Sequence, residues 1–144
     1  MKYRIYLDNC CFNRPYDDQK NLLVQLETKA KLFIQQAILQ KAFELVWSYI
    51  LDYENAANPY QNRRLTIAKW KKTAVLDVDA SEVIVSCGKE IMQKGIKKKD
   101  ALHIACAIDA KCDYFLTTDK KLLKVTFDKI NVINPIDFIK ILEI

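Results

Sequence analysis

Four acidic residues stand where the chain could bring their carboxylates together: Asp8, Glu54, Asp100 and Asp119. Asp8 ends an apolar run that starts at Tyr3, and Asp119 ends a run that starts at Tyr114; the β-branched and aromatic content of both runs is typical of buried strands. In an open α/β sheet, ligands bind beyond the carboxyl ends of the strands. Asp8 taken alone could simply cap the turn after it, so the other acids carry the hypothesis.

The position of Glu54 on its expected helix distinguishes it from Asp52. At about 100° per residue, Glu54 lies on the same stripe as Ile50, Leu51 and Ala57, whereas Asp52 points about 160° away. An inward-facing charge is unfavourable unless another group pairs with it. Glu54 is therefore the stronger candidate of the two.

Asp100 opens an alanine-rich helix, on the stripe that also carries Ile104 and Ala107. Two interpretations stay open, because an acid in the first turn of a helix also stabilises the helix dipole. Asp109 lies about 180° around the helix from Asp100 and is expected to be solvated. Asp100 is thus either a site residue or a residue that serves its helix alone.

Converging carboxylates repel one another, and a hard cation is the usual reason to tolerate this. Oxygen ligands favour Mg²⁺ or Mn²⁺ over Zn²⁺, and one or two such ions can activate water and stabilise the leaving oxygen of a phosphodiester. The sequence therefore predicts a magnesium or manganese site. His103 is expected to pack in its helix rather than bind metal, and Cys10 and Cys11 are expected to be buried rather than redox-active.

The apolar patterns place these residues on alternating strands and helices. An amphipathic helix over about residues 19–40 separates the first strand from a second at 43–47, and this βαβ order implies a parallel sheet. Ser48 should cap a helix that runs to about residue 57. Further strands are expected at 74–78, 113–118 and 131–133, and further helices at 60–71, 81–94, 99–110, 120–124 and from Pro135. Residues 9–15 should form a turn.

Length and composition bound the class of protein. With 144 residues, 51% of them hydrophobic and 28% charged, the chain fits a single globular domain over residues 1–144. The five cysteines form no C-x-x-C pair and have no histidines at zinc spacing, so we expect reduced thiols in a cytosolic protein. No secretory signal or membrane-spanning run is recognisable. We therefore expect a cytoplasmic protein that does not associate with a membrane.

The net charge of +5 accompanies lysines that cluster in the second half of the chain. Such clusters are compatible with a polyanion partner such as RNA. They are equally compatible with solvated helix faces and helix C-termini, where the macrodipole favours lysine. The lysines that would flank a crevice at the strand ends are Lys97, Lys98, Lys99, Lys120 and Lys121.

Four short motifs, which together span essentially the whole chain, resemble those of PIN-domain nucleases: Leu7-Asp8-Asn9, Ser48 with Glu54 six residues later, Asp100-Ala-Leu-His-Ile-Ala, and Leu116-Thr117-Thr118-Asp119. The resemblance implies a three-layer α/β/α sandwich around a mostly parallel sheet of about five strands. It also implies metal-dependent cleavage of RNA, often by the toxin of a toxin–antitoxin pair. The partners implied are RNA, a small antitoxin protein and a second copy of the chain in a homodimer.

By the same resemblance, Mg²⁺ or Mn²⁺ would be held by Asp8, Glu54, Asp100 and Asp119, and the residues that support these ligands from behind would be Asn9 and Thr117. The segment Asn9–Pro15 replaces the aliphatic continuation that the family pattern has after the first acid. This departure bears on the toxin assignment more than on the fold or the metal site.

Two other classes of protein compete with a metal-dependent endoribonuclease. A non-catalytic RNA-binding or protein-interaction module on the same fold would not need all four acids, and all four are present. A phosphoacceptor domain of receiver type needs paired acids after the first strand and a lysine after the last, and Asp8-Asn9 and Asn134-Pro135 supply neither. The sequence therefore favours the hydrolase.

Overall fold

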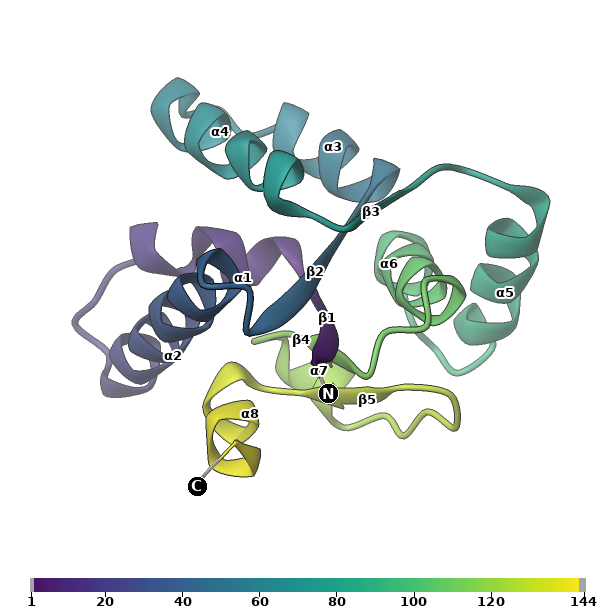
Figure 1. Ribbon diagram of the computed structural model, residues 1–144. Coiled ribbons are helices and arrows are strands. Elements are labelled where there is room, and N and C mark those ends of the chain that lie inside the picture. The colour runs from purple at the N-terminus through teal and green to yellow at the C-terminus, as the bar shows by residue number, and fades with distance from the viewer. Residues whose placement is uncertain (1, 143–144) are drawn as a thin grey trace.

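A five-stranded, all-parallel sheet forms the centre of the protein, which a computed structural model describes over residues 2–142 (Figure 1). In chain order the strands are β1 (Tyr3–Leu7), β2 (Phe43–Ser48), β3 (Leu76–Val78), β4 (Tyr114–Leu116) and β5 (Asn131–Ile133), and across the sheet their order is β3-β2-β1-β4-β5. Leu7 pairs with Leu116, so β1 and β4 end level with each other. The prediction of a parallel sheet with the first strand at its centre is confirmed.

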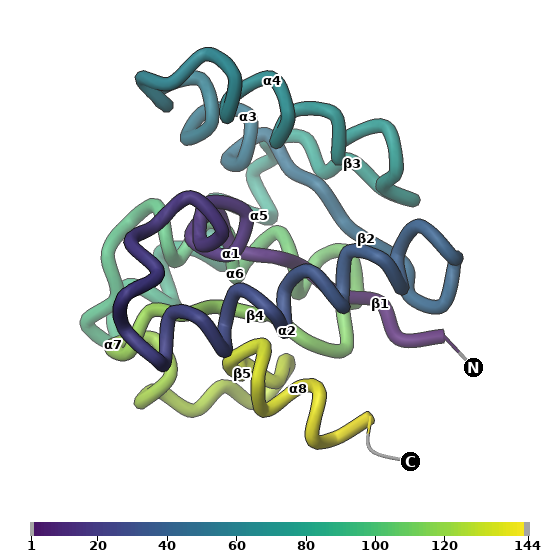
Figure 2. Tube along the Cα trace, turned by 90° about the vertical axis from the view of Figure 1, so that its left-hand side faces the viewer, coloured from purple at the N-terminus to yellow at the C-terminus, as the bar shows by residue number. Residues whose placement is uncertain are grey.

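Helices cover both faces of the sheet, which gives the predicted three-layer α/β/α sandwich. Helices α2 (Leu22–Leu39) and α8 (Pro135–Ile141) lie side by side on one face (Figure 2), and α6 (Lys98–Asp109) lies on the other with α5 (Glu82–Met92) packed against it (Figure 1). The shorter elements are α1 (Asn9–Asn13), α3 (Tyr49–Ala56), α4 (Gln61–Ala68), α7 (Lys120–Leu123) and two 3-10 helices, η1 (Arg14–Tyr16) and η2 (Lys69–Thr73). Within residues 2–142, no helix is both long and apolar enough to cross a bilayer.

Strand β1 is apolar because both of its faces are covered. Ile5, Tyr6 and Leu7 have no exposed surface, and burial of such side chains contributes roughly 25 cal/mol per Å² of apolar area to folding. The Tyr6 ring stacks on Phe115 of β4 with 5.2 Å between the ring centroids. The strand is therefore held on both sides, and it delivers the next residue, Asp8, to the edge of the sheet in a defined position.

The turn expected after β1 is instead helical and forms α1 and η1. Asp8 caps α1, because its side chain accepts a hydrogen bond from the Asn9 backbone N–H at 2.8 Å. Cys11 and Phe12 are fully buried, and Phe12 packs edge-on against Trp47 of β2. The prediction was wrong because the local pattern is polar, while contacts with a distant strand stabilise the helix.

Helices α5 and α6 pack closely against each other. Ala101 and Ala105 of α6 are buried. A Cβ on Gly88 of α5 would lie only 3.0 Å from the Leu102 side chain, so a larger residue there would require that side chain to shift. Gly95, with a φ of +87°, makes the turn after α5 that sends the chain into α6.

Candidate metal centre

All four candidate acids line one pocket of about 310 Å³ at the carboxyl end of the sheet. Asp8 follows β1 and Asp119 comes shortly after β4, whereas Glu54 lies in α3 and Asp100 in the first turn of α6. Because β1 and β4 end at the same level of the sheet, the carboxylates that follow them, Asp8 and Asp119, lie in the same pocket. The other residues that line the pocket are Asn9, Cys10, Asn13 and Asp17.

Asp8 is the most deeply buried of the four acids, with 5% of its surface exposed. Its Oδ2 accepts a hydrogen bond from Thr117 Oγ1 at 2.8 Å, and its Oδ1 accepts one from the Asn9 N–H at 2.8 Å. Burial, and then the neighbouring Cys10, raise the pKa of Asp8 well above its ordinary value, although His103 and Thr117 act in the other direction. A carboxylate in these surroundings favours a cation beside it.

Glu54 reaches into the pocket and is bonded to His103. His103 Nε2 and Glu54 Oε1 are in direct hydrogen-bond contact, and the same nitrogen lies 3.9 Å from Asp8 Oδ1. Partial burial raises the pKa of Glu54, but the hydrogen bond with His103 and the charges of His103 and Lys99 outweigh it and lower the pKa. His103 is fully buried, as expected of a packing residue, and it lies behind Glu54 rather than in the lining of the pocket. The sequence indicates the place of His103 near the acids, because His103 follows Asp100 by three residues and therefore lies on the same helix face.

Asp100 and Asp119 complete the acidic cluster. Burial, and then the charge of Asp119, raise the pKa of Asp100, and Glu54 acts in the same direction. Asp119 caps α7 by accepting a hydrogen bond from the Lys121 N–H at 2.8 Å, and its own N–H donates to Thr117 Oγ1 at 3.1 Å. The pocket therefore concentrates negative charge that protons or cations must balance.

Replacing Asp100 by asparagine should stabilise the metal-free protein. Because the pKa of Asp100 is raised on folding, the stability that this group contributes falls as the pH rises from about 4 through the folded-state pKa. We expect Asp100→Asn in EDTA at pH 7 to melt a few degrees higher than the parent in scanning calorimetry. Added Mg²⁺ should raise the melting temperature of the parent more than that of the variant. A lower melting temperature of the variant in EDTA would show that Asp100 stabilises its own helix instead.

The donor set fits a divalent metal ion. One ligand atom each from Asp8, Glu54 and His103 lies within 4.8 Å of the other two. Two ligands at roughly 2.0–2.2 Å on opposite sides of one ion lie at most about 4.4 Å apart, so this spacing is close to the one that a single ion needs. Asp100 and Asp119 line the same pocket, so carboxylate oxygens dominate the set. This predominance of oxygen favours magnesium or manganese.

Cys10 lines the pocket as well, although the sequence predicts that it is buried as a packing residue. Its Sγ lies 3.5 Å from Asp8 Oδ2 and 3.4 Å from Thr117 Oγ1. A hydrogen bond from Cys11 lowers the pKa of Cys10 more than burial raises it, and hydrogen bonds from Thr117 and Thr118 bring the pKa to about 6. Cys10 therefore belongs to the polar lining of the pocket beside Asp8.

Two acids that the sequence placed away from the cluster lie on the surface. Asp52 is exposed, accepts a hydrogen bond from Trp47 Nε1 at 2.9 Å and pairs with Lys71 at 3.0 Å. Asp109 is exposed on α6. Asp17, which the sequence did not put among the site residues, lines the pocket while pairing with Arg14.

A second cavity, of about 550 Å³, adjoins the acidic pocket, because Asp100 and Asp119 line both. Three of the five lysines predicted to bind RNA line it, together with Lys94; the three are Lys97, Lys120 and Lys121. Lys98 is exposed, and Lys99 Nζ lies 5.9 Å from the centre of the Tyr53 ring, beside Glu54. A basic cavity thus continues directly from an acidic one.

Residues 5–128 match the PIN domain family, and the chain belongs to that family. PIN domains are in general nucleases, which are hydrolases. The fold is similar to that of a chain in the crystal structure of VapBC2 from Rickettsia felis bound to a DNA fragment from their promoter, with a TM-score of 0.55 and 14% sequence identity over 91% of this chain and 98% of that chain. A search of curated proteins gave no significant match.

Proposed function

We propose that this protein is a Mg²⁺- or Mn²⁺-dependent endoribonuclease whose ion is held by Asp8, Glu54, Asp100 and Asp119. The observation that carries the proposal is the convergence of these four carboxylates in one pocket, in a chain of a nuclease family. A divalent ion held there would polarise the phosphodiester and activate water for its hydrolysis. Residues 1–144 would act as one domain, in the cytoplasm where RNA is found.

The residues of the chain would prepare this site by orientation and charge. Thr117 and the Asn9 N–H hold the buried carboxylate of Asp8 from two sides, which leaves it little rotational freedom. Glu54 and Asp100 approach from two helices, α3, which follows β2, and α6, which precedes β4. The lysines of the adjoining cavity would bind phosphates next to the scissile one and offset the repulsion between RNA and the acids.

Cleavage of RNA should require added Mg²⁺ or Mn²⁺ and stop in excess EDTA, because the clustered carboxylates repel a phosphodiester unless a cation lies between them. A labelled RNA resolved on a denaturing gel gives the measurement. Activity should return when the chelated protein is dialysed and supplied with metal. Cleavage that survives EDTA would contradict the proposal.

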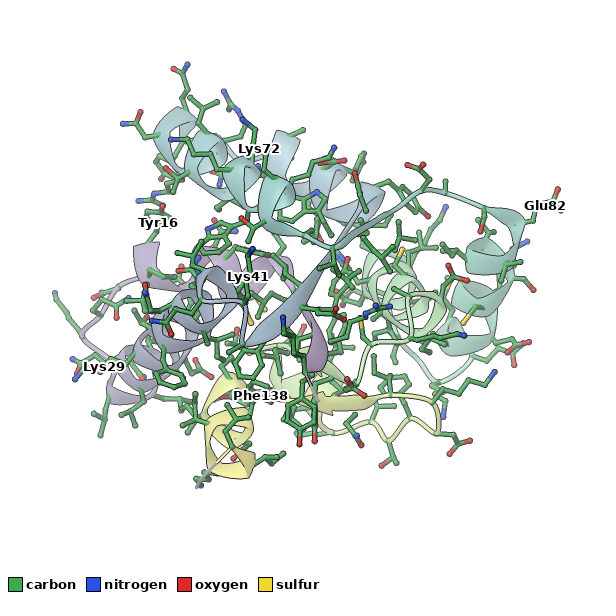
Figure 3. All side chains as sticks on the ribbon, in the orientation of Figure 1. Tyr16, Lys29, Lys41, Lys72, Glu82 and Phe138 are labelled. Atoms are coloured by element: carbon green, nitrogen blue, oxygen red, sulfur yellow. The ribbon has the colours of Figure 1, made fainter. Side chains whose placement is uncertain are left out.

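The lysines of the basic cavity should make RNA binding strongly dependent on salt. Counterion release gives a slope of roughly 0.7 log units of affinity per log unit of salt for each phosphate contacted. Lys97→Ala with Lys121→Ala should therefore reduce the slope by about 1.4 units in anisotropy titrations in EDTA. Lys29→Ala and Lys72→Ala, on α2 and η2 (Figure 3), are matched controls that should leave it unchanged. A flat salt dependence would make all these lysines ordinary surface residues.

A non-catalytic RNA-binding or protein-interaction module on the same fold is the second candidate. The basic cavity favours it, because its four lysines outnumber its two carboxylates and would bind a polyanion whether or not a reaction follows. Tight RNA binding without cleavage at saturating Mn²⁺ would support this module over the nuclease.

We also propose that a small antitoxin protein controls the activity. The similarity of the fold to the VapBC2 chain supports a place in a toxin–antitoxin pair. A gene for a small protein next to the gene for this chain, and co-purification of the two products with loss of RNA cleavage, would test this. Light scattering on the protein alone would test the homodimer.

A further inference from the structure

A chain of hydrogen bonds leads from the interior of the sheet to the wall of the acidic pocket. Its four members come from four elements: Ser48 of β2, Tyr6 of β1, His103 of α6 and Glu54 of α3. Tyr6 Oη lies 2.6 Å from Ser48 Oγ and 2.5 Å from His103 Nδ1, and His103 Nε2 contacts Glu54 Oε1. The first three side chains have no exposed surface. A fully buried polar chain thus ends on one of the proposed metal ligands.

The positions of the protons follow from what each group in this chain can donate. Ser48 Oγ accepts the Leu51 backbone N–H at 3.3 Å, so its own proton can go to Tyr6 Oη. The Tyr6 proton can then go to His103 Nδ1, and a neutral imidazole that accepts at Nδ1 carries its proton on Nε2. Nε2 is in this arrangement a donor aimed at Glu54. Every group in the chain then has a hydrogen-bond partner.

If His103 Nδ1 instead donated its proton to Tyr6 Oη, a neutral imidazole would carry a lone pair on Nε2, as a metal-ligating imidazole requires. That lone pair would face the carboxylate oxygen of Glu54 in direct contact and that of Asp8 at 3.9 Å. Three acceptors would then meet without a proton between them, which is unfavourable in a buried site. The contact between His103 and Glu54 therefore favours the donor arrangement.

We propose that His103 is a positioning residue, which donates its Nε2 proton to Glu54 and holds that carboxylate in the metal pocket. This inference rests on the proposed metal centre and adds to it a residue outside the four acids. The Glu54 side chain is 20% exposed, and the negative charges of Asp8 and Asp100 push it toward water. Tyr6 and Ser48 fix the imidazole, so Glu54 is in place before an ion binds.

His103 is the only histidine in the sequence, so the ¹⁵N NMR signals of its imidazole can be assigned without ambiguity in the tag-free protein. We expect a proton on Nε2, both without metal and at saturating Mg²⁺. Tyr6→Phe removes the donor to Nδ1 and should give a mixture of tautomers. An unprotonated Nε2 in the metal-free protein, or loss of its proton when Mg²⁺ is added, would overturn the proposal.

The affinity for Mn²⁺, measured by titration calorimetry without RNA, gives a second readout. His103→Leu should weaken Mn²⁺ binding by about 10–100-fold, the usual effect of losing the partner of a metal ligand. His103→Gln keeps an N–H donor and should restore most of the affinity, whereas a side chain that only fills space would not need one. Asp109→Asn, exposed on the same helix, is the control. Equal losses in His103→Gln and His103→Leu would contradict the donor role.

These measurements separate the positioning role from the proposed function. If the tautomer and the Mn²⁺ affinities are as expected but the parent does not cleave RNA, the proposed nuclease fails and the role of His103 stands. If the parent cleaves RNA while folded His103→Leu binds Mn²⁺ as tightly as the parent, the role of His103 alone fails. Circular dichroism of each variant establishes that it is folded.

Discussion

Replacing any one of the four acids should reduce the rate of RNA cleavage by at least roughly 100-fold, because changes to the partners of metal ligands already lower metal affinity or activity by about 10–100-fold. Each replacement removes a charge while keeping the volume of the side chain, so the effect reports the charge. The variants are Asp8→Asn, Glu54→Gln, Asp100→Asn and Asp119→Asn. Initial rates on a labelled RNA at fixed Mn²⁺ give the measurement.

Asp52→Asn and Asp109→Asn are the matched controls and should cleave RNA at the parental rate. Both side chains are exposed, and Asp52 pairs with Lys71 away from the pocket. An inactive Asp52→Asn beside an active Glu54→Gln would show that the assignment by helix face is wrong. Asp100→Asn separates activity from folding, since it should lose activity while the metal-free protein gains stability.

Arg14→Met should lower the free energy of unfolding by about 3 kcal/mol, because it leaves a buried carboxylate without its cation. Glu27 of α2 is only 2% exposed, and its Oε1 pairs with Arg14 Nη2 at 2.9 Å. Its Oε2 accepts a hydrogen bond from Asn134 Nδ2 at 2.5 Å. Arg14 itself is 22% exposed, which puts the expected loss at the lower end of the range for buried ion pairs. Urea denaturation measures it.

Two controls test the origin of this loss. Asp17→Asn breaks only the exposed side of the Arg14 network and should change stability by less than about 1 kcal/mol. The double variant Arg14→Met with Glu27→Met removes both charges and should be more stable than Arg14→Met alone. If the double variant were the less stable of the two, packing around the side chains rather than the unpaired charge would explain the loss.

The Arg14–Glu27 pair also gives a physical reason for the segment that departs from the family pattern. It docks η1 onto α2, while Asn13 at the end of α1 accepts a hydrogen bond from Asn58 Nδ2 at 3.2 Å. The same segment contributes Asn9, Cys10 and Asn13 to the lining of the acidic pocket. Its residues therefore connect one wall of the pocket to two neighbouring helical regions.

The sequence by itself was sufficient for the parallel sheet and for four of the five acids that line the pocket. The βαβ order of the patterns implies parallel strands, and parallel strands place their carboxyl ends at one edge whatever the side chains are. The period of the α-helix is equally local. It correctly predicted that Glu54 and Asp100 face the pocket. It also correctly predicted that Asp52 and Asp109 point away from it. Both inferences need only residues that are neighbours in the chain.

The tertiary structure alone decided the surroundings of His103 and the fold of the segment after β1. A helical pattern shows that His103 faces inward, but its partners Tyr6 and Glu54 come from elements 97 and 49 positions away. The segment after β1 is helical because Phe12 meets Trp47 and Arg14 meets Glu27. Such side-chain contacts depend on how the layers pack. Packing brings together residues that are far apart in the sequence, and no local sequence pattern indicates which of them will meet.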